Sequence, residues 1–301
     1  MLDTTNREST SRFSPILLFS ILGVISVGIW WGPLASLFAL ALHDEQYTHV
    51  FLILPICAAL IFLDSQPLGR KPHEPPVGLS MKIGSFLLVL AVLTTVTVRW
   101  RSVALPSDIE LPVSMLAFVV WCIAAFILCF GITAFRRAVF PLCFLLWMVP
   151  FPDFVSNTII SLLQRGSAES AHLLFLVAGI PVEQRGLLVH IPGLTLEVAP
   201  ECSSIRSSLI LLVTTMVLAQ LLLRSFGRKL FVVAVAIPLS VAKNGLRIFA
   251  LGVLATRVDP SFLDGNFHRH GGIIFFLIAL ATIFLLLWIL RRGEGKKPGI
   301  R

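Results

Sequence analysis

The chain has 301 residues, of which 56% are hydrophobic and only 13% are charged, and its mean hydropathy is +0.91. Soluble domains carry about 25% charged residues, so a chain this apolar cannot cover its surface in water. The composition excludes an ordinary soluble protein and predicts an all-α polytopic membrane protein. The net charge of +8 does not indicate a nucleic-acid partner, because the basic residues lie in short segments between apolar runs.

The apolar runs predict about eight transmembrane helices in one membrane domain, residues 1–301, with polar tails at 1–13 and 291–301. The first apolar run is interpreted as a retained span, because nothing that resembles a cleavage site follows it. The fifth expected span is shorter than the ~20 residues that a crossing normally needs. The expected spans are 14–34, 48–64, 80–98, 112–132, 134–151, 205–223, 230–255 and 271–290.

The basic residues predict the orientation of the chain. With eight spans, fifteen of the 24 basic residues fall on the same side of the membrane, which the positive-inside rule assigns to the cytoplasm. Both termini are therefore expected in the cytoplasm. These fifteen are Arg7, Arg12, Arg70, Lys71, Lys82, Arg136, Arg137, Arg224, Arg228, Lys229, Arg291, Arg292, Lys296, Lys297 and Arg301.

The opposite, extracytoplasmic side receives one long segment, residues 152–204. Its first part has apolar residues at helical spacing interrupted by polar ones, which predicts an amphipathic helix at the interface or packed over the bundle. Its second part contains LLVHI and LTLEV beside Gly186, Pro192 and Gly193, which predicts a small β-hairpin or β-ribbon before the sixth span.

Three residues able to support acyl-transfer chemistry fall at one depth in this topology. Cys202 directly precedes the sixth span, and His268 directly precedes the eighth. Arg247 lies about 25 Å along the seventh span at ~1.5 Å per residue, near the far boundary of a ~30 Å hydrocarbon core. A thiolate nucleophile, an imidazole base and a guanidinium that stabilises an oxyanion together fit a covalent acyl intermediate.

Neighbouring polar residues are expected to support these three. Arg206, one turn beyond Cys202, is a second candidate for stabilising the oxyanion, and Ser203 is a candidate cap for the sixth span. Lys243 and Asn244 lie on the seventh span just before the arginine, and charges inside a span are functional by default. Taken singly, an interfacial thiol, an arginine near the end of a span and a loop histidine are ordinary structural residues, so the hypothesis depends on their meeting.

Two further groups of residues give weaker signals. Tyr47, His49 and Asp44 form a weaker polar cluster at the outer end of the second span. No CxxC or Cys/His spacing typical of a metal site occurs, so neither a metal nor a cofactor is expected. The four other cysteines lie in apolar runs, where a thiol behaves as a small hydrophobe: Cys57, Cys122, Cys129 and Cys143.

Several segments, taken in order, resemble the exosortases, which are bacterial membrane cysteine transpeptidases related to archaeosortases. The resemblance extends from about residue 44 to residue 290. The segment ECSSIRS is similar to the family motif Cys-Ser-Gly-Ile-Arg-Ser, NGLRI to Asn-x-x-Arg-Ile, and FHRHGGIIFF to a final His-Gly-Gly motif. The similar segments also include DEQYTHVFLILPI, FPLCFLLWMVPFPD, GIPVEQRG and IPGLTLEVAPEC.

The resemblance implies that Cys202, Arg247 and His268 are catalytic. It implies substrates that are secreted proteins with a C-terminal tail: a Pro-Glu-Pro-like motif, an apolar span and basic residues. The enzyme would act at the bacterial inner membrane, cleave near the motif through a thioester and pass the protein to an unknown acceptor, often in connection with exopolysaccharide production. Ser204 replaces the glycine of the family motif, and we expect it to be tolerated because serine is favourable at a helix start.

Two alternatives stay open at this point. A transporter or lipid-carrier protein of an envelope polysaccharide pathway would also be polytopic, with Arg247 and Lys243 binding anionic cargo. Such proteins are expected to place ionisable residues near the midplane of several spans and often to contain repeats, whereas here the polar residues collect at the outer face. A structural scaffold would leave the meeting of the three residues unexplained.

Overall fold

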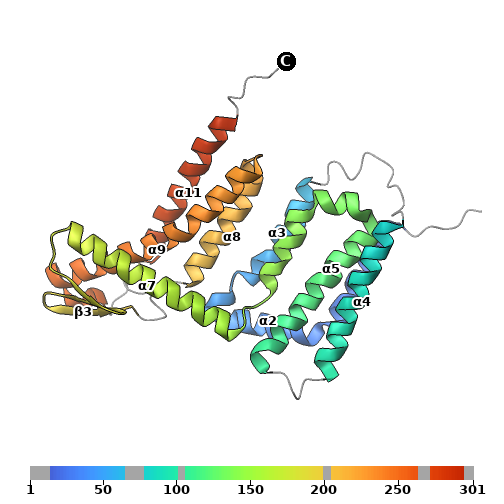
Figure 1. The fold of residues 1–301 in the computed structure, drawn as a ribbon, viewed down its shortest axis with the longest axis horizontal. Coiled ribbons are helices and arrows are strands. Elements are labelled where there is room, and N and C mark those ends of the chain that lie inside the picture. Colours follow the sequence, from blue (N-terminus) through green and yellow to red (C-terminus); the bar gives the residue numbers. More distant parts are fainter. Residues whose placement is uncertain (1–13, 65–77, 101–105, 199–204, 264–271, 295–301) are drawn as a thin grey trace, which may run out of the picture. The chain divides into compact units, whose positions relative to one another are not determined.

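A computed structural model describes residues 14–64, 78–100, 106–198, 205–263 and 272–294. The described chain is almost entirely helical with one small sheet (Figure 1), which confirms the prediction of an all-α polytopic membrane protein. It forms two compact units, Met1–Pro152 and Asp153–Arg301, and each is described by itself. The expectation of a single domain stays a prediction.

The first unit is a set of helices whose longest members are α4 and α5. Its helices are α1 (Pro15–Ile29), α2 (Trp31–His43), α3 (Val50–Asp64), α4 (Leu79–Trp100), α5 (Ser107–Arg137) and α6 (Val139–Phe144). A short 3₁₀ turn, η1 (Glu45–Tyr47), lies between α2 and α3, and a second, η2 (Leu145–Met148), follows α6.

Helices α4 and α5 pack closely because a glycine lies at their contact. A Cβ atom at Gly84 would lie 2.6 Å from Cγ of Leu128, so only a residue without a side chain allows this approach. The hydroxyl of Ser80 accepts a hydrogen bond of 3.3 Å from the backbone N–H of Ile132. The start of α4 therefore lies beside the end of α5, as expected for antiparallel neighbours in a membrane bundle.

The second unit consists of α7 (Asp153–Val177), a three-stranded sheet, and the helices α8 (Ile205–Leu222), α9 (Phe226–Arg257) and α11 (Gly272–Glu294). A short 3₁₀ turn, η4 (Pro260–Leu263), follows α9. Helices α8, α9 and α11 pack side by side around an apolar core (Figure 1) that includes Leu211, Val232 and Ile283.

The sheet is antiparallel and follows α7 directly. Its strands β1 (Glu183–Arg185), β2 (Leu188–Ile191) and β3 (Leu194–Glu197) pair in chain order. Gly186 and Gly193 make the two turns with φ of 64° and 84°, a region in which L side chains are strained. The predicted hairpin of LLVHI and LTLEV is confirmed as β2 and β3, and β1 adds an edge strand that the sequence analysis did not predict.

The number of predicted spans agrees with the structure better than their boundaries do. Within the described residues, six helices are long and apolar enough to cross a membrane, and two pairs of helices separated by short breaks raise the number to eight if each pair is one span. The first expected span is the pair α1 and α2, bent by 73°, and the helix continues to His43 instead of ending near residue 34.

The region of the fifth expected span, 134–151, differs most from the prediction. The end of α5, helix α6 and η2 occupy it, and α7 is a separate helix that begins at Asp153. Gly131 interrupts α5 with a φ of 80°, a backbone conformation that ends regular helix. Pro150 and Pro152 lie in the non-helical break between η2 and α7, where proline cannot continue the helical hydrogen bonds.

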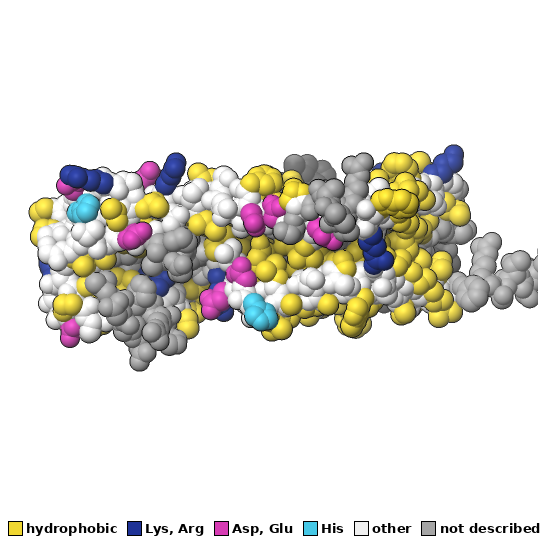
Figure 2. Space-filling model, turned by 90° about the horizontal axis from the view of Figure 1, so that it is seen from below, with side chains coloured by type: hydrophobic (Ala, Val, Ile, Leu, Met, Phe, Trp, Pro, Cys, Tyr) yellow, Lys and Arg dark blue, Asp and Glu magenta, His cyan; other side chains and the backbone are white. Residues whose placement is uncertain are grey.

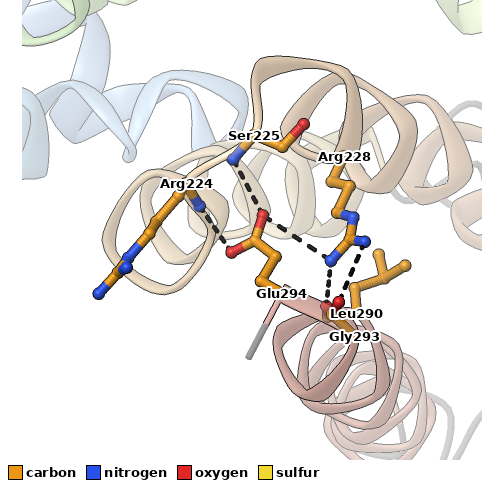
Figure 3. A network of polar contacts seen from close by, with 6 residues as sticks. All are labelled: Arg224, Ser225, Arg228, Leu290, Gly293 and Glu294. Atoms are coloured by element: carbon orange, nitrogen blue, oxygen red, sulfur yellow. Dashed lines mark hydrogen bonds and ion pairs between the residues drawn. The ribbon is translucent and has the colours of Figure 1, made fainter. Parts of the chain in front are cut away.

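Helices α9 and α11 cap each other at the end of the unit where basic residues gather (Figure 3). The carboxylate of Glu294 accepts hydrogen bonds from the backbone N–H groups of Arg224 and Ser225, at 3.0 and 2.9 Å. The guanidinium of Arg228 donates a hydrogen bond of 2.7 Å to the carbonyl oxygen of Leu290. Polar groups that helix ends leave without partners are thus satisfied. The assignment of this end to the cytoplasm stays a prediction.

Large apolar side chains are exposed along the helices of both units. They include Phe86 and Leu93 on α4 and Ile273 and Leu277 on α11. Figure 2 shows hydrophobic side chains over much of one face, with charged groups in small, separate clusters. Exposed Leu, Ile and Phe on helices of this length are typical of surfaces that face lipid.

Candidate functional site

The middle of α9 carries a stripe of polar residues on an otherwise apolar helix. Ser240, Lys243, Asn244 and Arg247 are spaced at i, i+3, i+4 and i+7, which places them on one face. The first three are buried and the arginine is half-buried. Buried polar groups in a membrane helix need partners, and the neighbouring helices α7 and α8 supply hydroxyls.

Helix α7 contacts this stripe through two serines, which meet an asparagine and a glycine of α9. The side-chain amide of Asn244 donates a hydrogen bond of 2.9 Å to the hydroxyl of Ser167. At Gly245, an added Cβ atom would lie 2.5 Å from Cβ of Ser170 and 3.0 Å from the backbone nitrogen of Ala171. The glycine therefore permits the approach of the two helices that brings the Asn244 amide to its partner.

Helix α8 contacts the same stripe at its first turn. The ammonium of Lys243 donates a hydrogen bond to the hydroxyl of Ser207, and the hydroxyls of Ser240 and Ser208 are 2.5 Å apart. These contacts join the first turn of α8 to the middle of α9. Residues 199–204 directly precede this turn, so the chain enters α8 beside the cationic part of α9.

Helix α11 begins against the same part of α9. The position that a Cβ atom of Gly272 would occupy lies 3.9 Å from a terminal nitrogen of Arg247 and 4.0 Å from its Cζ. The guanidinium therefore reaches the first residue of α11. The residues from Lys243 to Arg247, about one helical turn, thus contact the beginnings of both α8 and α11.

The sheet packs over the far part of α9 and connects to α7. A Cβ atom at Gly252 would lie 2.8 Å from Cζ of Phe175 and 2.9 Å from Cδ1 of Leu196. Gln164, buried in α7, donates a hydrogen bond of 2.8 Å to the carbonyl oxygen of Val198. This bond holds the chain immediately before residue 199.

The residues predicted from the sequence are distributed as follows. Arg247 and Asn244 lie in the polar stripe of α9, and Arg206 lies exposed in the first turn of α8. Cys202, Ser203 and His268 lie outside the described residues, as does Ser204. Their roles stay predictions.

Tyr47 and His49 belong to the first unit. His49 is buried, and its Nδ1 atom lies 3.0 Å from the carbonyl oxygen of Gln46. Its ring lies edge-on to Trp147, with the centroids 6.3 Å apart, and nearly parallel to that of Tyr47 at 6.5 Å. The two predicted residues thus lie in one aromatic cluster, whose role as a supporting part of the site stays a prediction.

The sequence analysis named no partners for Lys243 and did not identify the serines of α7. The signal that could have found them was compositional: Ser167 and Ser170 are small polar residues three apart on an amphipathic helix. Within the described part of the chain, no three His, Cys, Asp or Glu side chains are close enough together to hold a metal ion.

The comparison with protein families decides the classification. The family described as transmembrane exosortase matches residues 30–285. The chain belongs to the exosortase family. The matched range contains most of both units of this exosortase, all the described elements from α2 to η4 and much of α11. It also contains residues 199–204 and 264–271.

Membership in this family supports a membrane transpeptidase of the exosortase type. It agrees with the apolar, multi-spanning architecture of the chain, which is that of a multi-pass membrane protein. No curated protein and no solved structure matches the chain.

Proposed function

We propose that this exosortase is a cysteine transpeptidase in which Cys202 is the nucleophile, His268 the general base and acid, and Arg247 the group that stabilises the oxyanion. The observation that carries the proposal is the contact of one turn of α9 with the beginnings of α8 and α11. Cys202 precedes α8 by three residues and His268 precedes α11 by four. At up to ~3.6 Å per residue, these tethers are at most about 11 and 14 Å long.

The reaction has two balanced steps. The Cys202 thiolate attacks the carbonyl carbon of the scissile peptide bond, and the oxyanion that forms is stabilised by the guanidinium of Arg247. The C–N bond breaks, His268 gives its proton to the leaving amine, and the thioester remains on the sulfur. An acceptor nucleophile then attacks the thioester and loses its proton to His268, which regenerates the thiolate.

The polar residues around these groups have supporting roles in the proposal. Arg206 is placed by its helix at the first turn of α8 and is the second cation available to the oxyanion or to the substrate. Asn244 ties α9 to α7 and so orients the arginine one turn later. Ser203 caps α8, and Tyr47 and His49 are assigned to substrate binding or support.

The proposed substrates are secreted proteins that carry a C-terminal motif of the Pro-Glu-Pro kind, an apolar span and a basic tail. The span holds the scissile bond at the membrane surface, where the beginning of α8 is expected. The proposed location is the bacterial inner membrane, with both termini in the cytoplasm and the site on the extracytoplasmic face. The proposed role is protein sorting connected with exopolysaccharide or envelope assembly.

The test uses the full-length protein in nanodiscs with a fluorescent substrate that carries such a tail. We expect wild-type protein to shorten the substrate on a gel and to release a hydroxamate when hydroxylamine is the acceptor, because a thioester reacts with that amine. Cys202→Ala should abolish both products. Cys143→Ala is the matched control, since this cysteine is exposed and has no role in the proposal. Unchanged processing by Cys202→Ala would refute the assignment.

A further inference from the structure

Lys243 is a buried cation that the proposed reaction does not use. Its residue is 6% exposed, and its ammonium donates to the neutral hydroxyl of Ser207. Among the residues that the structure describes, no carboxylate forms an ion pair with it. A second cation, Arg247, follows four residues later on the same face of the helix.

This arrangement is unfavourable for stability. A buried charge without an opposite charge loses hydration that a single hydroxyl does not replace, and like charges at i, i+4 repel each other. An unbranched apolar residue at position 243 would fill the same space between α8 and α9 without this cost. The features that Lys243 does provide are a hydrogen bond to the first turn of α8 and a positive charge at that turn.

We propose that Lys243 is a positioning residue of the transpeptidase: it holds the first turn of α8 through Ser207, and its charge stabilises the negative charge that develops beside that turn during the reaction. The inference rests on the proposed function. Arg206 lies in the same first turn of α8 and Arg247 lies one turn further along α9, and both are positive. The α7 face that packs here presents Ser167 and Ser170, and α11 begins there with Gly272.

The chain contains a matched control for this residue. Lys229 lies in the first turn of the same helix, and its ammonium donates a hydrogen bond of 2.7 Å to the side-chain oxygen of Gln220 on α8. Both lysines therefore join α9 to α8 through a neutral oxygen. They differ in position: Lys243 lies beside the start of α8, and Lys229 lies beside the end of α8.

The experiment compares Lys243→Gln, Lys243→Arg, Ser207→Ala and Lys229→Gln in the full-length protein. Lys243→Gln removes the charge but keeps a donor for Ser207, whereas Ser207→Ala keeps the charge and removes the hydrogen bond. Three quantities are measured: the rate of substrate processing against pH, the rate at which iodoacetamide alkylates Cys202 against pH, followed by mass spectrometry, and the thermal unfolding midpoint.

With Lys243→Gln we expect the processing rate at neutral pH to fall about 10-fold. Both pH profiles should shift upward by about one unit, because a thiolate forms at higher pH when a nearby positive charge is removed. Lys243→Arg should keep the wild-type profiles. Ser207→Ala should lower the rate without a shift, and Lys229→Gln should match wild type.

Several results would overturn the inference. The first is full activity of the Lys243→Gln protein. The second is a loss of its activity that is equal at every pH, with no shift in the pH profile of Cys202 alkylation. The third is a shift in the pH profiles of Lys229→Gln as large as that of Lys243→Gln. If Lys243→Gln does not fold, the test rests on Lys243→Arg. A shifted pH profile in a normally stable Lys243→Arg protein would also overturn the inference. Alkylation of Cys202 needs no substrate turnover, so it tests the role of Lys243 independently of the proposed function. The proposed function itself would be refuted if the Cys202→Ala protein processed the substrate normally.

Discussion

The guanidinium of Arg228 lies 3.9 Å from the carboxylate of Glu294, and each side chain also bonds the backbone at the end of the other's helix. An exposed ion pair alone contributes little to stability. Here the two residues additionally satisfy backbone groups that helix ends leave without partners. They therefore contribute to stability as helix caps.

We expect Glu294→Ala to lower the thermal unfolding midpoint of the protein, because two backbone N–H groups before α9 lose their acceptor. Glu294→Gln should have a smaller effect, since its amide oxygen still accepts one hydrogen bond. Differential scanning fluorimetry in detergent measures both. The control is Glu183→Ala, which removes an exposed pair with Arg185 and should leave the midpoint unchanged. Equal midpoints for Glu294→Ala and wild type would contradict the capping role.

Gly245 should not tolerate a side chain. Gly245→Ala places a methyl group against Ser170 and the backbone of Ala171, and we expect it to cost about 1–3 kcal/mol of unfolding free energy. Adding Ser170→Gly should recover part of this loss. Gly227→Ala is the control, because nothing lies within 4 Å of its added Cβ atom. The close contact of α7 and α9 would be disproved if the Gly245→Ala and Gly227→Ala proteins were equally stable in an SDS titration.

The hydrogen bond between Asn244 and Ser167 should appear as a coupling energy. We expect the effects of Asn244→Ala and Ser167→Ala on unfolding free energy to be non-additive by about 1 kcal/mol, the usual worth of one hydrogen bond. The measurement is a double-mutant cycle in the same SDS titration. Strict additivity would mean that the two side chains do not interact in the membrane.

Activity should require the planar guanidinium of Arg247. Loss of an oxyanion donor typically lowers turnover by about 10²–10³-fold, and we expect a loss of that size in Arg247→Met. Arg247→Lys should also lose most activity, because an ammonium keeps the charge but not the fork of donors. Processing of the tailed substrate measures both, with the exposed Arg257→Lys on the same helix as control. Full activity in Arg247→Lys would indicate that charge alone suffices.

Gln164 should hold the chain that leads from the sheet toward Cys202. Gln164→Leu leaves the carbonyl of Val198 without its donor, and we expect a cost of about 1–3 kcal/mol for this buried acceptor. Amides of residues 187–198 should exchange hydrogen faster. Gln184→Leu is the comparison, since that side chain makes an exposed bond to Gly186. Identical exchange in both variants would show that the α7 contact does not stabilise the sheet.

The sequence predicted those elements whose signals are local. Alternating β-branched and Leu-rich residues between glycines predicted β2 and β3, and apolar runs predicted the spans of α3, α4, α8, α9 and α11. The division of residues 134–151 into the end of α5, helix α6 and η2 was not predicted. A positive φ at Gly131 and the proline pair around residue 151 each permit several backbone paths, and packing selects one of them.

The level of Arg247 was predictable, because topology alone brings this residue to the part of the unit where α8 and α11 begin. The contacts of the polar stripe of α9 were not predictable. The pairing of Lys243 with Ser207, and of Asn244 with Ser167, depends on helix rotation and on the close approaches at Gly245 and Gly272. These are properties of several helices together, which no single run of residues contains.

Helix α8 ends and helix α9 begins at the same end of their unit, but the two differ in length, with 18 and 32 residues. At ~1.5 Å per residue they measure about 27 and 48 Å, so α9 is longer than a ~30 Å hydrocarbon core is thick, whereas α8 nearly matches it. In the proposed reaction, a cut beside the start of α8 would use this difference as a ruler. The position of the cut would then be measured from the bilayer surface, and we expect substrates to be sorted by the number of residues between their motif and their own span.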